Sequence, residues 1–255
     1  MLIQSPTFAE QYTTVNFYNY TPQQPTKDIL MRCMLFIYQD VPGVANLMAD
    51  LPTDCRTVCI PKMSWRVFWP FTPKTEKELR KYPYSDAYVL DLIRRGYTKE
   101  QVIKRYLQLD VHKHIDLEDV YQKNIAYLDS AHNTRDFRIT DYIVDNFTKR
   151  ELFFSYNHPH KDILLLVANE ILNIMGLQPL DPKDAESLPS LGEDFQMPIH
   201  PAIADFFRLE FYTLETTVHQ YGEQVNFSRY LENYVDSEML PTTRRDDYKK
   251  GSFLI

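Results

Sequence analysis

Apolar positions in the first 61 residues predict a strand–helix–strand unit. The continuous apolar run MLFIY at 34–38 is typical of a strand that is covered on both faces. A second short strand is expected at 57–61, and 44–51 has helical character between them. This order indicates a parallel sheet. A further strand is predicted at 14–20, which is rich in β-branched and aromatic residues.

From residue 85 onward the apolar spacing becomes helical. The first helix is expected to end at Gly96, and Thr98 with Gln101 makes a capping box that opens the next helix. Asp116 and Thr140 are expected to cap two more helices, because short polar side chains accept hydrogen bonds from the first free backbone N–H groups. A helical region is therefore expected to follow the strand–helix–strand unit.

The segment 151–156 predicts a return to strand. Pro159 is expected to begin a strong helix that ends at Gly176, because proline is favoured at the first helical position. A polar loop is expected at 181–196. After it, His200-Pro201 repeats the His-Pro pair that is expected to begin the preceding helix. Helices are expected at 202–209, 212–221 and 228–235.

These elements predict a helix-rich α/β fold, in which a small parallel β-sheet is flanked by helices. The expected organisation is a single domain over residues 1–235, followed by a polar C-terminal tail at 236–255. No signal sequence or long apolar segment is evident, so we expect a cytoplasmic protein with no stable membrane insertion.

Charge and cysteine usage narrow the possible functions. The net charge is −7 and no block of lysine or arginine occurs, which argues against nucleic-acid binding. The six glycines form no phosphate-binding cluster. Cys33, Cys55 and Cys59 lack the spacing of a metal site, so no metal is expected. Cys59 lies in an apolar run and is expected to be a buried structural thiol.

The segment SYNHPH at 155–160 is the strongest candidate for chemistry. If Pro159 begins a helix, His158 lies at a helix N-terminus, where anions bind and the helix dipole favours neutral imidazole. Neutral imidazole can act as a general base, and Asn157 can cap the turn or donate to a substrate carbonyl. The alternative is a simple helix cap with exposed histidines.

Further candidates depend on tertiary structure. His200 can share a cleft with His158, or its similarity can be coincidence. Tyr38 and Gln39 end the buried strand, where ligands collect in open α/β sheets, and Lys62 follows the next strand. Gln39 can equally satisfy a loop backbone.

Two aromatic segments have a structural interpretation and a functional one. The segment 82–86 is favoured as a helix-opening turn stabilised by Asp86. The aromatic residues at 65–71 are favoured as core or lid packing. The sharper alternative for them is a platform for an acyl chain or a sugar.

Taken in order, these segments resemble the WcbI-type polysaccharide biosynthesis proteins, bacterial enzymes of capsule and surface-glycan modification. The resemblance covers roughly residues 8–212. The matching pieces are the strand ending in Tyr38-Gln39, the strand and aromatic turn at 60–70, the helical pair at 84–96 and from Thr98, the Asn157-His158-Pro159 turn, and the segment 199–204 with His200-Pro201.

The resemblance implies a helix-rich α/β fold that binds coenzyme A or acetyl-CoA and transfers an acetyl group to a sugar hydroxyl. It implies a saccharide or small-molecule substrate and leaves homo-oligomer formation open. The candidate catalytic residues are then His158, as general base, and His200. The candidate cofactor contacts are Tyr38, Gln39, Lys62 and Asn157.

One motif of the family is not found in this chain. Family members carry a Gly-Asn-Cys-Gln turn after their first strand, and none of Cys33, Cys55 and Cys59 stands in that context. Met1 is expected to lie past the position of this turn. The alternative function is therefore a non-catalytic member of the family that binds coenzyme A or a glycan as a scaffold. A glycosyltransferase-like enzyme is disfavoured, because the sequence has no Asp-x-Asp motif.

Overall fold

The computed structural model describes residues 31, 33–39, 44–60, 62–73, 82–132, 139–181, 183, 186, 192 and 194–240. The chain divides into two compact units, residues 1–60 and 61–255. The division therefore falls after the second predicted strand and not in the polar loop at 181–196. The predicted strand at 14–20 lies outside the described residues. A single domain over residues 1–235 stays a prediction.

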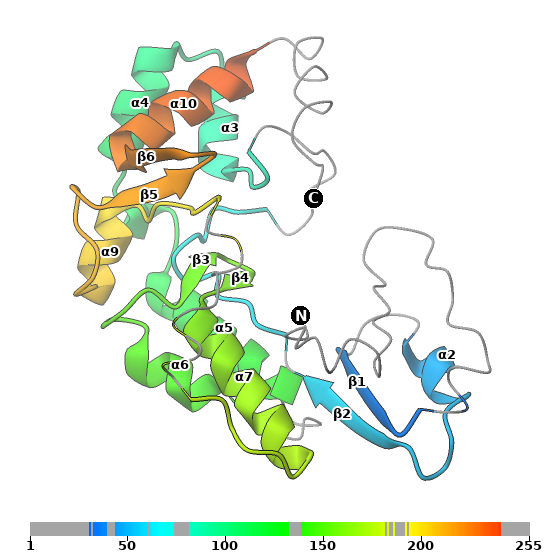
Figure 1. Cartoon of the computed structure of the whole chain (residues 1–255). Coiled ribbons are helices and arrows are strands. Elements are labelled where there is room, and N and C mark those ends of the chain that lie inside the picture. Colours follow the sequence, from blue (N-terminus) through cyan, green and yellow to red (C-terminus); the bar gives the residue numbers. More distant parts are fainter. Residues whose placement is uncertain are drawn as a thin grey trace. The chain divides into compact units, whose positions relative to one another are not determined.

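The first unit contains the predicted strand–helix–strand arrangement. Strand β1 (Leu35–Gln39) pairs in parallel with β2 (Arg56–Ile60), and helix α2 (Val44–Met48) lies between them in the chain (Figure 1). Val58 is fully buried and Cys59 is 4% exposed, so the prediction of a buried thiol is confirmed. The apolar run of β1 is only half-buried along its length.

In the second unit, three helices pack together beside a β-hairpin (Figure 1). Thr98 accepts from the backbone of Gln101 and the Gln101 side chain accepts from Thr98, which confirms the predicted capping box. Asp86 caps the first of the helices, as predicted. The elements are α3 (Ala87–Arg94), α4 (Lys99–Leu107), α10 (Phe227–Met239), β5 (Thr217–Gln220) and β6 (Glu223–Asn226), with the short helix η1 (Val111–Lys113) after α4.

The same unit holds a second hairpin with its own helices. Strands β3 (Phe153–Ser155) and β4 (His158–Pro159) are antiparallel, and α7 (Lys161–Ile174) follows them directly. Helices α5 (Leu117–His132) and α6 (Thr140–Asn146) contact each other in this region, and α9 (Pro201–Phe207) completes the elements.

An aromatic core supports the second hairpin. Trp65 is fully buried and stacks on Phe153 of β3, with ring centroids 6.1 Å apart. Phe147 and Tyr121 bring α6 and α5 against the same indole. Phe68 is also buried and meets the indole edge-on. Core packing is thus the observed role of this aromatic segment.

One predicted helix is wrong and another begins two residues later than expected, because the local backbone forms hairpins. The segment 212–221 contains β5, not a helix, because Tyr221 and Gly222 have φ of 50° and 87° and form a two-residue hairpin turn. His158-Pro159 forms β4, so the helix begins at Lys161 and not at Pro159. Gly176, with φ of 72°, follows the end of that helix as predicted.

Two smaller boundaries also differ from prediction. Thr140 lies inside α6, buried at 2% exposure, and Ile139 occupies the cap position without a side-chain hydrogen bond. Helix α10 continues to Met239, so the tail expected from residue 236 has a helical beginning.

The helix-rich α/β class is confirmed. Over the described ranges, β1 and β2 form the parallel pair, whereas β3–β4 and β5–β6 are antiparallel. Among these residues, no helix combines the length and apolar character needed to cross a membrane.

Candidate active site

The β3–β4 hairpin places a polar network at its turn. Ser155 and His158 are cross-strand partners, and Tyr156 and Asn157 make the turn between them. Ser155 is fully buried, whereas Asn157 and His158 are exposed. The hairpin therefore holds His158 against the buried Ser155 and leaves part of its ring accessible to solvent.

His158 is held through one ring nitrogen. Its Nδ1 lies 2.7 Å from the Tyr84 hydroxyl and 2.7 Å from Ser155 Oγ. The Tyr84 hydroxyl also donates to Asn157 Oδ1 at 2.6 Å, and Ser155 Oγ donates to Tyr84 at 3.1 Å. Tyr84, Ser155, Asn157 and His158 form one closed network, which we call the His158 network.

The network indicates which nitrogen carries the proton. If Nδ1 carries no hydrogen, only the hydroxyl hydrogens of Tyr84 and Ser155 are available for three short contacts of 2.6–2.7 Å. These contacts join Tyr84 to Asn157, Tyr84 to Nδ1 and Ser155 to Nδ1. One of them would then place two lone pairs against each other. With a hydrogen on Nδ1, shared between Ser155 and Tyr84, every contact contains a hydrogen. With Asn157 Oδ1 as the acceptor of the Tyr84 hydroxyl, the hydrogen bonds favour the proton on Nδ1 and the lone pair on Nε2.

Partial burial lowers the pKa of His158 below its ordinary value of 6.5. Desolvation is the cause, since it disfavours the charged imidazolium. The helix dipole expected from the sequence is not the cause, because α7 begins at Lys161 with His160 as its cap. The direction of the expected shift is right, and its predicted origin is wrong.

The predicted anion site at a Pro159 helix start is also wrong. Pro159 lies in β4 and has no N–H, and the N–H of His160 donates to Leu152 O at 2.8 Å. The His160 ring caps α7 by accepting from Asp162 N. These backbone groups are therefore not available to a ligand at His158.

Two polar groups of the turn remain open. Within the described part of the chain, neither His158 Nε2 nor Asn157 Nδ2 makes a hydrogen bond, and both residues are exposed. Asn157 Oδ1 accepts from Tyr84, which fixes the amide so that Nδ2 is the free end. A proton acceptor and a hydrogen-bond donor thus stand on adjacent residues.

A cationic side chain lies near the turn. Trp65 N–H donates to Tyr156 O at 2.7 Å, and the Arg66 guanidinium covers the Tyr156 ring at 4.5 Å. Arg66 Nη1 is held by Thr72 O at 2.9 Å. Lys62 precedes Trp65 by three residues, so its Cα lies within about 11 Å of Trp65. The structure therefore places one positive charge, that of Arg66, beside the turn, and Lys62 stays a prediction.

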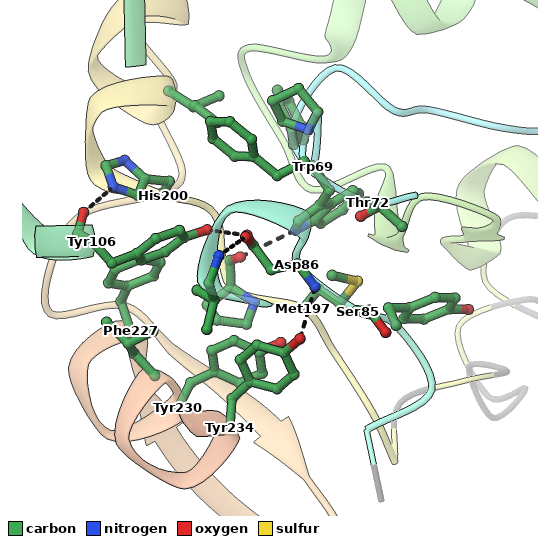
Figure 2. Close-up of a pocket in the computed structure, with 18 residues that line it drawn as sticks. Trp69, Thr72, Ser85, Asp86, Tyr106, Met197, His200, Phe227, Tyr230 and Tyr234 are labelled. Carbon is green, nitrogen blue, oxygen red and sulfur yellow. Dashed lines mark hydrogen bonds between the residues drawn. The ribbon is translucent and has the colours of Figure 1, made fainter. Parts of the chain in front are cut away.

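Figure 2 shows a small cavity lined by Asp86, Tyr106 and His200. Tyr84 also lines it. The volume of the cavity is about 30 Å³, which suits little more than a water molecule. Asp86 accepts from the Tyr106 hydroxyl and from Val89 N, and Asp86 N–H donates to the Tyr234 hydroxyl at 2.8 Å. Burial raises the pKa of the Asp86 carboxyl. This cavity holds a structural polar cluster.

His200 lines this cavity, but His158 does not. Its Nε2 donates to Tyr106 O at 2.9 Å and its Nδ1 accepts from Ala202 N at 3.2 Å, with the side chain 3% exposed. Burial lowers the pKa of His200, although the Tyr106 carbonyl opposes this. His200 caps α9 with Pro201 at the first turn, as predicted. Both of its ring nitrogens are engaged in holding the fold.

The remaining candidates lie in the first unit. Tyr38 and Gln39 end β1, as expected, and Tyr38 stacks on Phe36 with centroids 5.7 Å apart. Their participation in the site stays a prediction. The His158 network thus brings together His158 and Asn157, and the role of Lys62 also stays a prediction.

Sequence reasoning missed Tyr84 and Ser155. Tyr84 lies 74 residues before His158 in the chain, and no local pattern pairs them. Ser155 had a usable signal, because a two-residue turn makes it the cross-strand partner of His158.

The state of His158 can be tested directly by proton NMR. We expect its ring C2–H to titrate with a pKa below 6.5, because burial disfavours imidazolium. A lowered pKa means that neutral imidazole is favoured in the folded protein. Stability is then lost as pH falls below 6.5 through the folded pKa. The spectrum of His158→Gln assigns the signal, and a midpoint above 6.5 would contradict the expectation.

Comparison with known proteins places this chain in a family. A family model described as polysaccharide biosynthesis enzyme WcbI matches residues 1–180. A solved structure of WcbI, a novel polysaccharide biosynthesis enzyme, has a TM-score of 0.66 at 17% identity, over 86% of this chain and 76% of that one. It is described as the native protein without a disulfide bond between coenzyme A and one of its cysteines. That likeness shows the fold alone.

No curated protein matches the chain. The family model nevertheless covers well over half of it. The resemblance seen in the ordered sequence segments is thereby confirmed. This chain belongs to the WcbI family of polysaccharide biosynthesis enzymes.

Proposed function

We propose that this protein is a coenzyme-A-dependent acetyltransferase that acts on a sugar hydroxyl in capsule or surface-polysaccharide biosynthesis. The observation that carries the proposal is His158, whose Nδ1 is fixed by Tyr84 and Ser155 while Nε2 stays exposed. Family membership supports the polysaccharide role. The coenzyme A named for the WcbI structure supports the choice of cofactor.

The proposed chemistry uses the lone pair on His158 Nε2. Acetyl-CoA supplies an acetyl thioester, whose carbon–sulfur bond is exchanged for a carbon–oxygen bond to the sugar while the thiol leaves. His158 accepts the hydroxyl proton through Nε2, because its lowered pKa keeps the ring neutral near pH 7. The proton then passes to the departing sulfur, which returns His158 to its neutral form.

Asn157 has the complementary role in this proposal. Its Nδ2 is the free end of an amide whose Oδ1 is fixed by Tyr84 at 2.6 Å. A fixed N–H donor next to the base can stabilise negative charge on a carbonyl oxygen. This replaces the helix-start N–H groups expected from the sequence.

We propose that coenzyme A binds outside the cavity, on the exposed side of the turn. Pockets for ligands of this size hold about 300–1,000 Å³, whereas the cavity lined by Tyr84 holds about 30 Å³. Arg66 lies over the Tyr156 ring and offers positive charge for a phosphate near the turn, and Lys62 remains a proposed cofactor contact. Tyr38 and Gln39 remain proposed cofactor contacts from the first unit.

His200 serves the site indirectly in this proposal. Both its ring nitrogens are engaged, and it is nearly fully buried, so it positions Tyr106 and α9. Tyr84 lines the same cavity and also binds His158, which connects the two clusters. Of the two histidines, only His158 is therefore proposed to transfer the proton.

Ser155 is a positioning residue and not a nucleophile. It is fully buried beneath His158 and hydrogen-bonds Nδ1, which is the nitrogen that faces the protein. A serine nucleophile must be accessible to substrate and contact the nitrogen that receives its proton. The arrangement therefore favours direct transfer, in which the sugar hydroxyl itself attacks.

Calorimetry and turnover test the proposed function together. The purified chain is titrated with coenzyme A, and acetyl-CoA consumption is followed by chromatography with saccharide acceptors. Heat on binding and acceptor-dependent consumption are expected. Absence of both heat and a thermal shift at millimolar coenzyme A would overturn the proposal. Binding without turnover would favour the non-catalytic scaffold. The need for acetyl-CoA places the proposed reaction in the cytoplasm.

A further inference from the structure

The β5–β6 turn holds an aromatic residue in an unusual conformation. Tyr221 has φ of 50° and Gly222 has φ of 87°, which makes a hairpin turn whose first position favours asparagine, aspartate or glycine. An aromatic side chain is disfavoured there on steric grounds. Tyr221 is 47% exposed, so its ring is only partly covered by the fold. A strained, exposed aromatic residue points to a functional role.

The Tyr221 ring is fixed in place. Its backbone N–H donates to Asp194 O at 2.8 Å, and its ring lies 5.4 Å from Phe195 and 6.5 Å from Tyr82, centroid to centroid. Partial burial raises the pKa of the Tyr221 hydroxyl to about 12. The ring is thus packed against two neighbouring rings and still exposes part of its surface.

A short segment connects this ring with His158. The Phe195 ring lies 6.2 Å from that of Tyr84, which hydrogen-bonds His158. Phe195 N–H donates to Gly192 O at 3.3 Å. A Cβ added to Gly192 would come within 3.4 Å of His158 Cδ2, the ring atom beside Nε2. Gly192 therefore lies beside the ring of the candidate base, and Phe195 contacts both the Tyr84 ring and the Tyr221 ring.

We propose that Phe195 and Tyr221 form a stacking platform for a neutral hexopyranose unit of the acceptor saccharide. The apolar C–H face of such a sugar matches an aromatic ring, and fixed aromatic side chains lose little entropy on binding. Asp194 and Glu223 are exposed next to these rings and can accept hydrogen bonds from sugar hydroxyls. The same two carboxylates repel a uronic acid, so the platform selects a neutral sugar.

This inference rests on the proposed function and specifies its acceptor. Tyr127 provides a contrast, because it is similarly exposed at 44% but lies on helix α5. The adenine ring of coenzyme A can also stack on an aromatic side chain. The test must therefore measure sugar binding and coenzyme binding separately.

The test uses saturation-transfer NMR of methyl β-D-glucopyranoside with wild-type protein and with Tyr221→Asn. Asparagine suits the turn, so this variant keeps the hairpin while it removes the ring. We expect the sugar dissociation constant to rise by about 3- to 10-fold in Tyr221→Asn. Tyr221→Phe and the control Tyr127→Asn are expected to bind like wild type. Methyl β-D-glucuronide is expected to bind more weakly than the glucoside.

Separate outcomes overturn the two proposals. No saturation transfer to wild type at millimolar glucoside, or equal binding by Tyr221→Asn, would overturn the platform. Loss of coenzyme A binding in Tyr221→Asn with sugar binding retained would assign the rings to the coenzyme and also overturn it. Sugar binding through Tyr221 in a chain that binds no coenzyme A would uphold the platform and overturn the proposed acetyltransferase.

Discussion

Replacement of His158 by glutamine is expected to lower the turnover of acetyl transfer by about 10²- to 10⁴-fold, the usual contribution of a general base. Glutamine can still hydrogen-bond Ser155 and Tyr84, but its amide cannot accept the hydroxyl proton. His158 is exposed, so the fold should tolerate the change. Acetyl-CoA consumption by wild type and variant, with coenzyme A calorimetry on both, measures the effect.

His112→Gln is the matched control for this experiment. His112 is also exposed, but it lies on η1 and packs against Phe206. It should keep wild-type turnover. A His158→Gln variant that retains full turnover would show that another group takes the proton. If His158→Gln also loses coenzyme A binding, the lower turnover would be explained by a role of His158 in binding the cofactor and not by proton transfer from the acceptor.

Trp65→Ala is expected to destabilise the protein by about 3–5 kcal/mol, the usual cost of truncating a large buried aromatic side chain. Trp65 is fully buried and contacts rings from α5, α6 and β3, through Tyr121, Phe147 and Phe153. Its backbone N–H also holds Tyr156 at the turn. Urea unfolding followed by circular dichroism gives the change in the free energy of unfolding.

Trp65→Phe should cost much less than Trp65→Ala, because it keeps an aromatic ring in the core. In the described part of the chain, Trp65 Nε1 has no hydrogen-bond partner, so the change to phenylalanine breaks no hydrogen bond there. Leu107→Ala, at a side chain that is 40% exposed, is the surface control and should change stability little. Equal losses for Trp65→Ala and Leu107→Ala would refute the assignment of Trp65 to a cooperative core.

Helix boundaries were readable from the sequence where short polar side chains cap them. The capping box of Thr98 and Gln101 and the Asp86 cap depend on residues only three positions apart. The parallel pair β1–β2 was also predictable, because its apolar runs flank a helix. The β3–β4 and β5–β6 hairpins were not predicted, because Pro159 favoured a helix start and Tyr221 is uncommon in such a turn.

In the His158 network, too, some features were predictable from the sequence and others depended on tertiary structure. The sequence alone identified Asn157 and His158 and predicted a neutral imidazole. Tertiary structure decided the reason for that neutrality, since burial and not a helix dipole lowers the pKa. It also separated His200, whose ring is engaged by Tyr106 O and Ala202 N, from the exposed candidate base.

By itself, the sequence determined the helix-rich α/β class, the helix starts at Asp86 and Thr98, and the segment that carries the candidate base. These features depend on neighbours a few positions apart, which a chain pattern records. Only the tertiary structure brought Tyr84 from across the chain to His158 and set Phe195 between Tyr84 and Tyr221. Such contacts are chosen by packing in three dimensions, and no local spacing in the chain encodes them.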